Sequence, residues 1–217
     1  MTSTDEQMRA IKRQFRRAMN GIVAAGMRER GVVYRVNFGL TLPLLKRIAS
    51  QYTPDRTLAE RLWGEQVRES KMLATWLYPA DEMTWDRACR WVDEIPYAEI
   101  ADLCCMNLFS RLPYAFALAA HAAAQPGDMA LYTAVRLWNR LLGDGRECPE
   151  SERHALFGAC RRLFAGEGSA PALAAAADAL RRLAARDEPT HRQVEIFFAE
   201  TASELPPDTA LFVREIL

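Results

Sequence analysis

Apolar residues recur at steps of three and four along most of this chain, whereas sustained alternation of apolar and polar residues is scarce. Such spacing places the apolar side chains on one face of a helix. The first predicted helix spans 5–30, with an apolar stripe made of Met8, Ile11, Phe15, Met19 and Ile22. Ala, Leu, Arg and Glu dominate the sequence, which also favours helix. The pattern therefore predicts an all-α protein.

Turn-forming residues divide the rest of the chain into further segments. Gly31 is expected to end the first helix, residues 33–39 read as an extended or turn segment, and Thr41 with Pro43 marks the next helix start. The pattern predicts helices over 41–51, 55–63, 65–78, 84–94, 97–109, 113–124, 128–142, 150–165, 170–186 and 189–204. A short helix is expected after Pro206–Pro207.

Many helices of similar length joined by short Pro/Gly turns indicate stacked helical hairpins. A paired-helix unit of about 35–40 residues is the period of HEAT-type repeats, which stack into a curved α-α superhelix with a concave groove. We therefore expect a single all-α HEAT-like domain over 1–217, with 143–217 the part that the pattern defines least. A plain helical bundle is the alternative that the pattern leaves open.

The charge balance limits how the protein could bind nucleic acid. Lys plus Arg and Asp plus Glu are both 28, so the formal net charge is zero and any basic surface must be local. The longest apolar stretch, 114–124, is about half of what a membrane span needs, and the N-terminus lacks a secretory signal. We expect a cytoplasmic monomer that contacts no membrane.

Cysteine and histidine usage points away from disulfides and metal sites. The five cysteines are odd in number and form no CxxC pair, so we expect reduced and mostly buried thiols. The three histidines stand alone, without metal-ligand spacing. The sequence also lacks dinucleotide-binding, Walker, zinc-protease and serine-hydrolase motifs. We therefore expect neither a metal nor a cofactor.

Three segments, in the same order and with similar spacing, carry a resemblance to a known family. The first is Tyr34–Pro43, with an aromatic residue followed by Phe-Gly and then a proline at a helix start. The second is Leu62-Trp63 followed by Val67–Ala74, and the third is Trp91–Ile95 followed by Glu99–Phe109. Together they resemble the AlkD-like DNA alkylation repair family over residues 30–142, whereas 143–217 matches only in being helical.

The resemblance implies a HEAT-like fold that holds double-stranded, alkylated DNA on its concave face. Enzymes of this family are DNA glycosylases that excise cationic purines such as 3-methyladenine and 7-methylguanine. Their catalytic aspartate falls on Asp102, and Glu99 lies three residues earlier on the same helix face. A carboxylate there would stabilise the positive charge that develops on the sugar. The alternative is that both are ordinary solvated carboxylates.

The sequence departs from the family pattern at two aromatic positions. Active members have a tryptophan one turn before the aspartate, where this chain has Ala98, and a second in a late helix, near Asp178 here. Tyr97 is adjacent to the first position, but on a helix it points about 100° away. These departures count against glycosylase activity.

Candidate DNA contacts combine the resemblance with basic doublets on several helices. The candidates are Tyr34, Lys46, Arg47, Arg68, Tyr97, Arg136 and Arg140. The alternative for each cation is a solvated helix face with salt bridges. The tryptophans at 63, 76, 85, 91 and 138 lie among apolar residues and are expected in the core.

Three functional hypotheses follow. The first is a glycosylase acting on alkylated purines, with Asp102 as its carboxylate. The second is a relative without catalytic activity that binds DNA, and the third is a HEAT-like scaffold that binds protein. The first two predict positive charge around Asp102, whereas the third allows a mixed or apolar groove.

Overall fold

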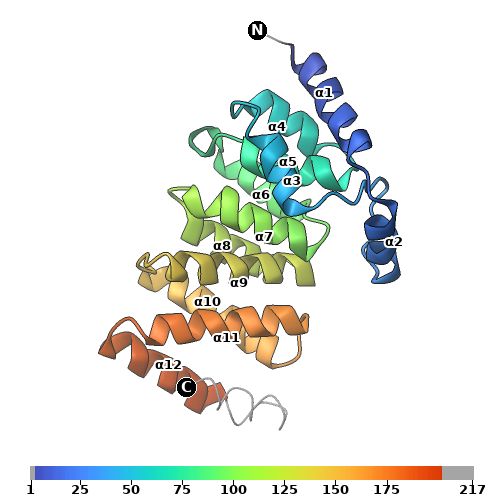
Figure 1. Ribbon diagram of the computed structural model, residues 1–217. Helices are drawn as coiled ribbons and strands as arrows, with labels where there is room; N and C mark the ends of the chain where they lie inside the picture. The colour runs from blue at the N-terminus through green and yellow to red at the C-terminus, as the bar shows by residue number, and fades with distance from the viewer. Residues whose placement is uncertain (1–2, 202–217) are drawn as a thin grey trace. The chain divides into compact units, whose positions relative to one another are not determined.

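The computed structural model describes residues 3–201, and every regular element in that range is a helix (Figure 1). The only strand-like pairing among these residues is an isolated parallel bridge between Val36 and Val67. The chain divides into two compact units, Met1–Met83 and Thr84–Leu217, which we call the first and second unit. The all-α prediction is confirmed, and the short helix expected after Pro206–Pro207 lies outside the described residues.

The first unit is built around a pair of short helices with a third helix packed on each. Its elements are α1 (Thr4–Arg17), α2 (Gly21–Glu29), α3 (Leu42–Ala49), α4 (Arg56–Trp63), α5 (Arg68–Leu77) and the 3₁₀ turn η1 (Ala80–Glu82). Helix α5 packs on α4 and α3, and α1 packs on α4. Leu45, Leu58, Leu62 and Leu73 are fully buried between them, and this burial is the main force that holds short helices together.

The single helix predicted over 5–30 is wrong, because the chain breaks between Arg17 and Gly21. Asn20 caps α2 by accepting a hydrogen bond from Val23 N, and its own N–H donates to the carbonyl of Phe38 at 2.8 Å. The long-range bond to Phe38 favours the break, although the apolar spacing runs through it. Met19 and Ile22, the last members of the predicted stripe, are consequently 62% and 87% exposed.

The segment after α2 is extended, as predicted, and is anchored at both ends. Gly31 lies just past α2 with φ +82°, which confirms the predicted stop. Gly39 has φ +72°, and a Cβ there would lie 2.2 Å from the carbonyl oxygen of Asn20, so only glycine fits. Val36 pairs with residues 66–68, which keeps those residues extended and delays the start of α5 from the predicted 65 to Arg68.

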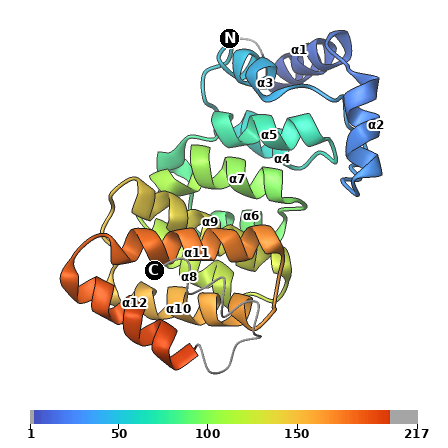
Figure 2. The same cartoon turned by 60° about the horizontal axis from the view of Figure 1, so that its bottom comes forward.

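The second unit consists of helices in two layers. Its elements are α6 (Trp85–Asp93), α7 (Ala98–Asn107), η2 (Phe109–Arg111), α8 (Ala115–Ala124), α9 (Asp128–Gly143), α10 (Glu150–Phe164), α11 (Ala170–Ala184) and α12 (Glu188–Thr201). Helices α7, α9 and α11 lie side by side in one layer (Figures 1 and 2). Helices α6, α8 and α10 follow one another in the second layer; α8 packs against α9, and α10 packs against α9 and α11. This is the stacked helical-hairpin arrangement that the sequence predicts.

The core of the second unit is formed by large aromatic residues packed among small ones. Trp91 and Trp138 are completely buried, as predicted, and so is Trp63 in the first unit. Trp76 is half-buried. The core prediction is wrong for Trp85, which is 39% exposed and makes edge contacts with the rings of Tyr114 and His121.

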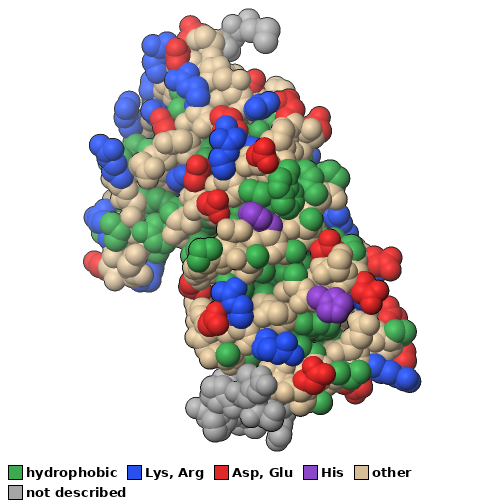
Figure 3. Space-filling view, turned by 180° about the vertical axis from the view of Figure 1, so that it is seen from behind, with side chains coloured by type: hydrophobic (Ala, Val, Ile, Leu, Met, Phe, Trp, Pro, Cys, Tyr) green, Lys and Arg blue, Asp and Glu red, His purple; other side chains and the backbone are tan. Residues whose placement is uncertain are grey.

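The layer of the second unit formed by α6, α8 and α10 has no surface region dominated by charges of one sign. Seen from behind, acidic, basic and apolar side chains are interspersed over the lower part of the molecule (Figure 3). All five cysteines are free, and four of them are buried, in agreement with the prediction. None of the helices described over 3–201 is long and apolar enough to span a membrane.

Candidate functional site

Asp102 on α7 is held by two side chains of α9. Its Oδ1 accepts a hydrogen bond from Arg136 Nε at 2.6 Å and one from the Tyr132 hydroxyl at 3.0 Å. Tyr132 and Arg136 are one helical turn apart, so both reach the same carboxylate. Asp102 Oδ2 has no hydrogen-bond partner within residues 3–201, and the Asp102 side chain is 39% exposed. The group is therefore positioned by the protein and still accessible.

The surroundings of Asp102 keep its neighbours in fixed protonation states near neutral pH. Burial, followed by the charge of Asp102, raises the pKa of Tyr132 to about 12, so the phenol remains a donor. Burial also raises the pKa of the Cys105 thiol far above its usual value. Burial lowers the pKa of Arg136, but the charge and the hydrogen bond of Asp102, with the smaller effects of Tyr132 and Cys105, together outweigh it, so the net pKa shift is upward. Asp102 is thus surrounded by one cation and two neutral groups.

The raised pKa of Tyr132 predicts a loss of stability at alkaline pH. The folded state binds this proton more tightly than an unfolded tyrosine with a pKa of about 10 does. Its contribution is therefore complete below pH 10 and is lost as pH rises through about 12. We expect the free energy of unfolding to fall by about 1 kcal/mol less in Tyr132→Phe than in wild type over this pH range, after allowance for solvent screening.

The measurement is the free energy of unfolding in urea at several pH values between 9 and 12. Burial also raises the pKa of cysteine thiols, which adds the same pH dependence to both proteins, so the informative quantity is the difference between wild type and Tyr132→Phe. Parallel curves would show that the phenol does not titrate as its environment implies.

The residues before Asp102 leave the aromatic position of the family pattern unfilled. Helix α7 begins at Ala98, and Tyr97 occupies its N-cap position. Tyr97, Ala98 and Glu99 are all half-buried, and Glu99 lies in the first turn, three residues before Asp102. The structure thus places Glu99 on the helix that carries Asp102, one turn nearer its N-terminus.

A second group of basic residues lies where α9 meets α11. A cavity of about 280 Å³, which we call the α9–α11 cavity, is lined by Arg136, Asn139, Arg140, Gly143, Asp144 and Arg182. Arg140 Nε donates to Asp144 at 3.0 Å, while within residues 3–201 no carboxylate pairs with Arg182. Arg136 belongs both to this cavity and to the Asp102 cluster, so the two features are continuous.

Sequence reasoning named Arg136 and Arg140, noted Arg182 only as part of the basic doublet Arg181–Arg182, and missed Tyr132 and Asn139. Tyr132, Arg136 and Arg140 follow one another at steps of four, which places them on one face of α9. That spacing is a signal by which Tyr132 could have been found. The contribution of Arg182 depends on the packing of α11 against α9, which no local pattern shows.

The remaining predicted DNA contacts belong to the first unit and differ in exposure. Lys46 and Arg47 are exposed in the last turn of α3, and Tyr34 is half-buried in the segment between α2 and α3. Arg68 is only 7% exposed, and its Nη1 donates to the carbonyl of Leu40 at 3.0 Å. The structure therefore assigns Arg68 an internal role that is unsuited to contacting a phosphate.

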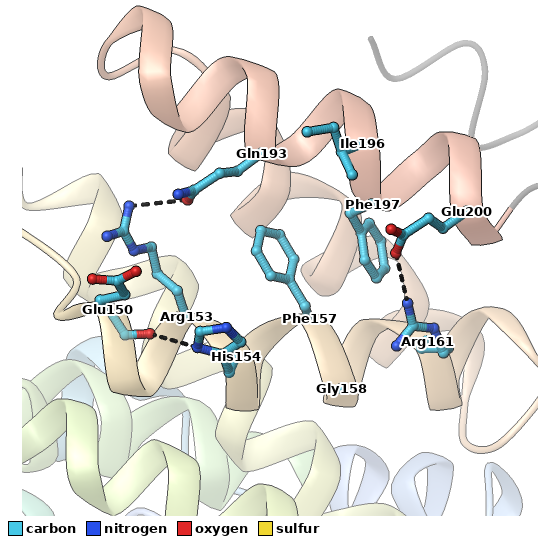
Figure 4. A pocket seen from close by; sticks show the side chains of 10 residues that line it. All are labelled: Glu150, Arg153, His154, Phe157, Gly158, Arg161, Gln193, Ile196, Phe197 and Glu200. Carbon is cyan, nitrogen blue, oxygen red and sulfur yellow. Dashed lines mark hydrogen bonds and ion pairs between the residues drawn. The ribbon is translucent and has the colours of Figure 1, made fainter.

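Another cavity, of about 350 Å³, lies between α10 and α12 (Figure 4). Phe157 stacks on Phe197 in its middle, with ring centroids 5.0 Å apart. Its arginines are already engaged, Arg153 with Gln193 at 3.1 Å and Arg161 with Glu200 at 3.6 Å. Because its walls are apolar and its cations are paired, this cavity is less suited to nucleic acid than the α9–α11 cavity. Within the described chain, no three potential metal ligands gather.

Comparison with known proteins identifies a family and a fold for this chain. Residues 11–141 match the family model described as DNA alkylation repair enzyme, which is more than half of the 217 residues. The matched range contains Asp102, Tyr132, Arg136 and Arg140 but ends before Arg182. A search of curated proteins found no match.

One solved structure shares the fold along most of the chain. It is described as belonging to "a new family of proteins related to the HEAT-like repeat DNA glycosylases with affinity for branched DNA structures". The TM-score is 0.72 with 16% sequence identity, and the match covers 89% of this chain and 82% of that one. The likeness confirms the predicted HEAT-like fold class, including its extension beyond residue 141.

Proposed function

The chain belongs to the DNA alkylation repair enzyme family, and from this premise we propose that it is a DNA glycosylase acting on cationic alkylated purines. Its substrates would be lesions such as 3-methyladenine and 7-methylguanine in double-stranded DNA, and it would act as a monomer without a cofactor. The observation that carries the proposal is the accessible Asp102 carboxylate, held at one oxygen by Arg136 and Tyr132.

The proposed chemistry needs little more than one positioned carboxylate. In an alkylated purine nucleotide the C1′–N9 bond breaks with both electrons going to the purine, whose positive charge they neutralise. The sugar then carries oxocarbenium-like charge, which Asp102 stabilises electrostatically. Water adds to C1′ and loses a proton, for which Asp102 Oδ2 is the acceptor in this proposal. Glu99, three residues away, adds negative charge on the same helix.

DNA would lie across the layer formed by α7, α9 and α11. Arg136 and Arg140 would contact phosphates there, and Tyr97 would contribute an aromatic surface beside Asp102. In the first unit, Lys46, Arg47 and Tyr34 are the proposed further contacts. Phosphate contacts give affinity without sequence preference, as repair of scattered lesions requires.

A second candidate function is DNA binding without base excision. Two observations favour it: Ala98 and Asp178 stand where active members of the family have tryptophans, and Arg136 partly neutralises Asp102. The protein with the similar structure comes from a family described as having affinity for branched DNA. A branched-DNA ligand would use the same phosphate contacts and would need no carboxylate chemistry.

One assay separates these functions. Purified protein, with Asp102→Asn beside it, is incubated with methylated duplex DNA, and released bases are quantified. Release by wild type alone supports the glycosylase. No release by either protein, with binding to duplex or branched DNA that weakens as salt rises, supports the binding function. Absence of both release and binding would reject both proposals and leave a protein scaffold.

A further inference from the structure

The α9–α11 cavity is lined by two side chains whose polar groups are not fully bonded within residues 3–201: Asn139 Oδ1 has no hydrogen-bond partner and Arg182 forms no ion pair. We propose that this cavity binds a phosphodiester group of DNA, with Asn139 and Arg182 as its specific donors beside Arg136 and Arg140. The inference rests on the proposed function only in that its ligand is DNA. It does not depend on base excision.

Asn139 is a polar side chain in an apolar position. It is 9% exposed and lies on α9 between the buried residues Trp138 and Leu141. Its Oδ1 is enclosed and has no hydrogen-bond partner within residues 3–201. An unsatisfied buried acceptor destabilises the folded state. Because Oδ1 is enclosed and Asn139 lines the cavity, its amide nitrogen is the end available to a ligand.

Arg182 reaches the same cavity from α11. An ideal Cβ placed on Gly143 would lie 2.9 Å from Arg182 Nη1 and 3.3 Å from its Cζ, so the guanidinium lies against the bare backbone of Gly143. Within the described part of the chain it forms no ion pair, unlike its neighbour Arg181, which is bonded to Asp178 at 2.9 Å. A guanidinium held this way can donate to an oxyanion without first breaking a salt bridge.

The charges and donors around the cavity match an oxyanion. Three arginines and one aspartate line it, so its walls carry a net positive charge. Arg136 and Arg140 use Nε for Asp102 and Asp144, respectively, and within 3–201 their Nη groups donate no hydrogen bond to a carboxylate. Planar guanidinium groups with free edges are the preferred partners of phosphate oxygens.

Arg136 also fixes where the bound phosphate would lie. Its Nε is bonded to Asp102 Oδ1 at 2.6 Å while its guanidinium lines the cavity. A phosphodiester in the cavity would therefore lie next to the Asp102 carboxylate, with only the Arg136 side chain between them. This would place the sugar attached to that phosphate near Asp102, in the glycosylase and in the branched-DNA case alike.

The test measures the affinity of the full chain for a methylated duplex as a function of salt. Arg182→Ala is expected to weaken binding about tenfold and to reduce the slope of log affinity against log salt by about 0.9. Asn139→Leu replaces the amide with an apolar group of similar shape and is expected to weaken binding about tenfold while thermal stability is kept or raised. Gly143→Ala displaces the Arg182 guanidinium and is expected to weaken binding without loss of fold.

Arg181→Ala is the matched control, because it removes the same charge one residue away without touching the cavity. An equal loss of affinity with Arg181→Ala, or no loss with Arg182→Ala and Asn139→Leu, overturns the proposal. Inorganic phosphate is added in a separate arm against chloride at equal ionic strength. If phosphate occupies the cavity but none of the variants changes duplex affinity, the cavity is a small-anion site and the proposal is wrong.

Base release is measured on the same preparations, so that the two proposals fail separately. If the wild type releases no base, the glycosylase proposal is rejected, while the measured affinities still test the phosphate site in the cavity. If the wild type releases base but Arg182→Ala and Asn139→Leu keep the wild-type affinity, the phosphate site is rejected and the glycosylase proposal stands.

Discussion

Asp102→Asn is expected to lower the rate of alkylated-base release by about 100-fold or more, which is the usual cost of removing one charge-stabilising group from an active site. Asparagine keeps the size of the side chain and an oxygen that can accept from Arg136 and Tyr132. The fold should survive, because half-exposed ion pairs contribute about 1 kcal/mol or less. The loss would therefore report the missing charge. Single-turnover release from methylated duplex measures it.

Glu167→Gln provides the control for this substitution. Glu167 is also a partly exposed carboxylate bonded to the Nε of an arginine, Arg162 at 2.7 Å, but it follows α10 and is not part of the Asp102 cluster. Release within about twofold of wild type is expected for it. Glu99→Gln then separates the two carboxylates of α7. A loss as large as that of Asp102→Asn would assign the chemistry to the pair, whereas an unchanged rate for Asp102→Asn would exclude Asp102 as the catalytic group.

The helical architecture could be predicted from the sequence because it depends on local signals. Apolar spacing and the Pro/Gly turns located the helices from 41 to 204, and each overlaps an observed helix. The prediction failed where a long-range bond decided the structure. The N–H of Asn20 bonds to the carbonyl of Phe38, eighteen positions away, and the periodicity of 5–30 contains no trace of that bond.

The candidate site was accessible to sequence only in part. The resemblance located Asp102, Arg136 and Arg140, because they fall in the segment that the family model also matches. The roles of Arg68 and Asn139 depend on their burial in the folded protein, which the sequence does not show. Arg68 is basic and lies at a helix start, which is compatible with a phosphate contact, yet it is enclosed by tertiary packing. Asn139 reads as an ordinary polar residue, and only its enclosure in the structure shows that it is unusual.

Glu69→Ala is expected to destabilise the first unit by about 3–5 kcal/mol, the cost of removing one partner from a buried ion pair. Glu69 is 0% exposed, and its carboxylate accepts hydrogen bonds from the backbone N–H groups of Phe38 and Leu40 at 3.1 and 3.2 Å. Arg68 Nη1 lies 3.3 Å from the same carboxylate. The substitution would remove the acceptor of both N–H groups and the carboxylate that lies against the buried Arg68 guanidinium.

The consequence reaches the segment that carries the first resemblance to the family. Glu69 holds residues 38–40, where Gly39 takes its positive φ against the backbone of Asn20. Glu69→Ala should therefore raise amide hydrogen exchange at residues 36–40 before the rest of the first unit. Glu29→Ala, at an exposed position at the end of α2, should change stability by less than about 0.5 kcal/mol.

Arg68→Ala applies the same reasoning to a predicted DNA contact. A buried guanidinium neutralises no phosphate, so the substitution should lower stability by about 3–5 kcal/mol and leave the salt dependence of DNA binding unchanged. Urea unfolding with hydrogen exchange measures the first effect, and duplex binding at several salt concentrations measures the second. A stable variant with a reduced salt slope would show that Arg68 does contact a DNA phosphate. An unstable variant with an unchanged slope would leave the arginines of α9 and α11 and the exposed cations of α3 as the basic contacts with DNA.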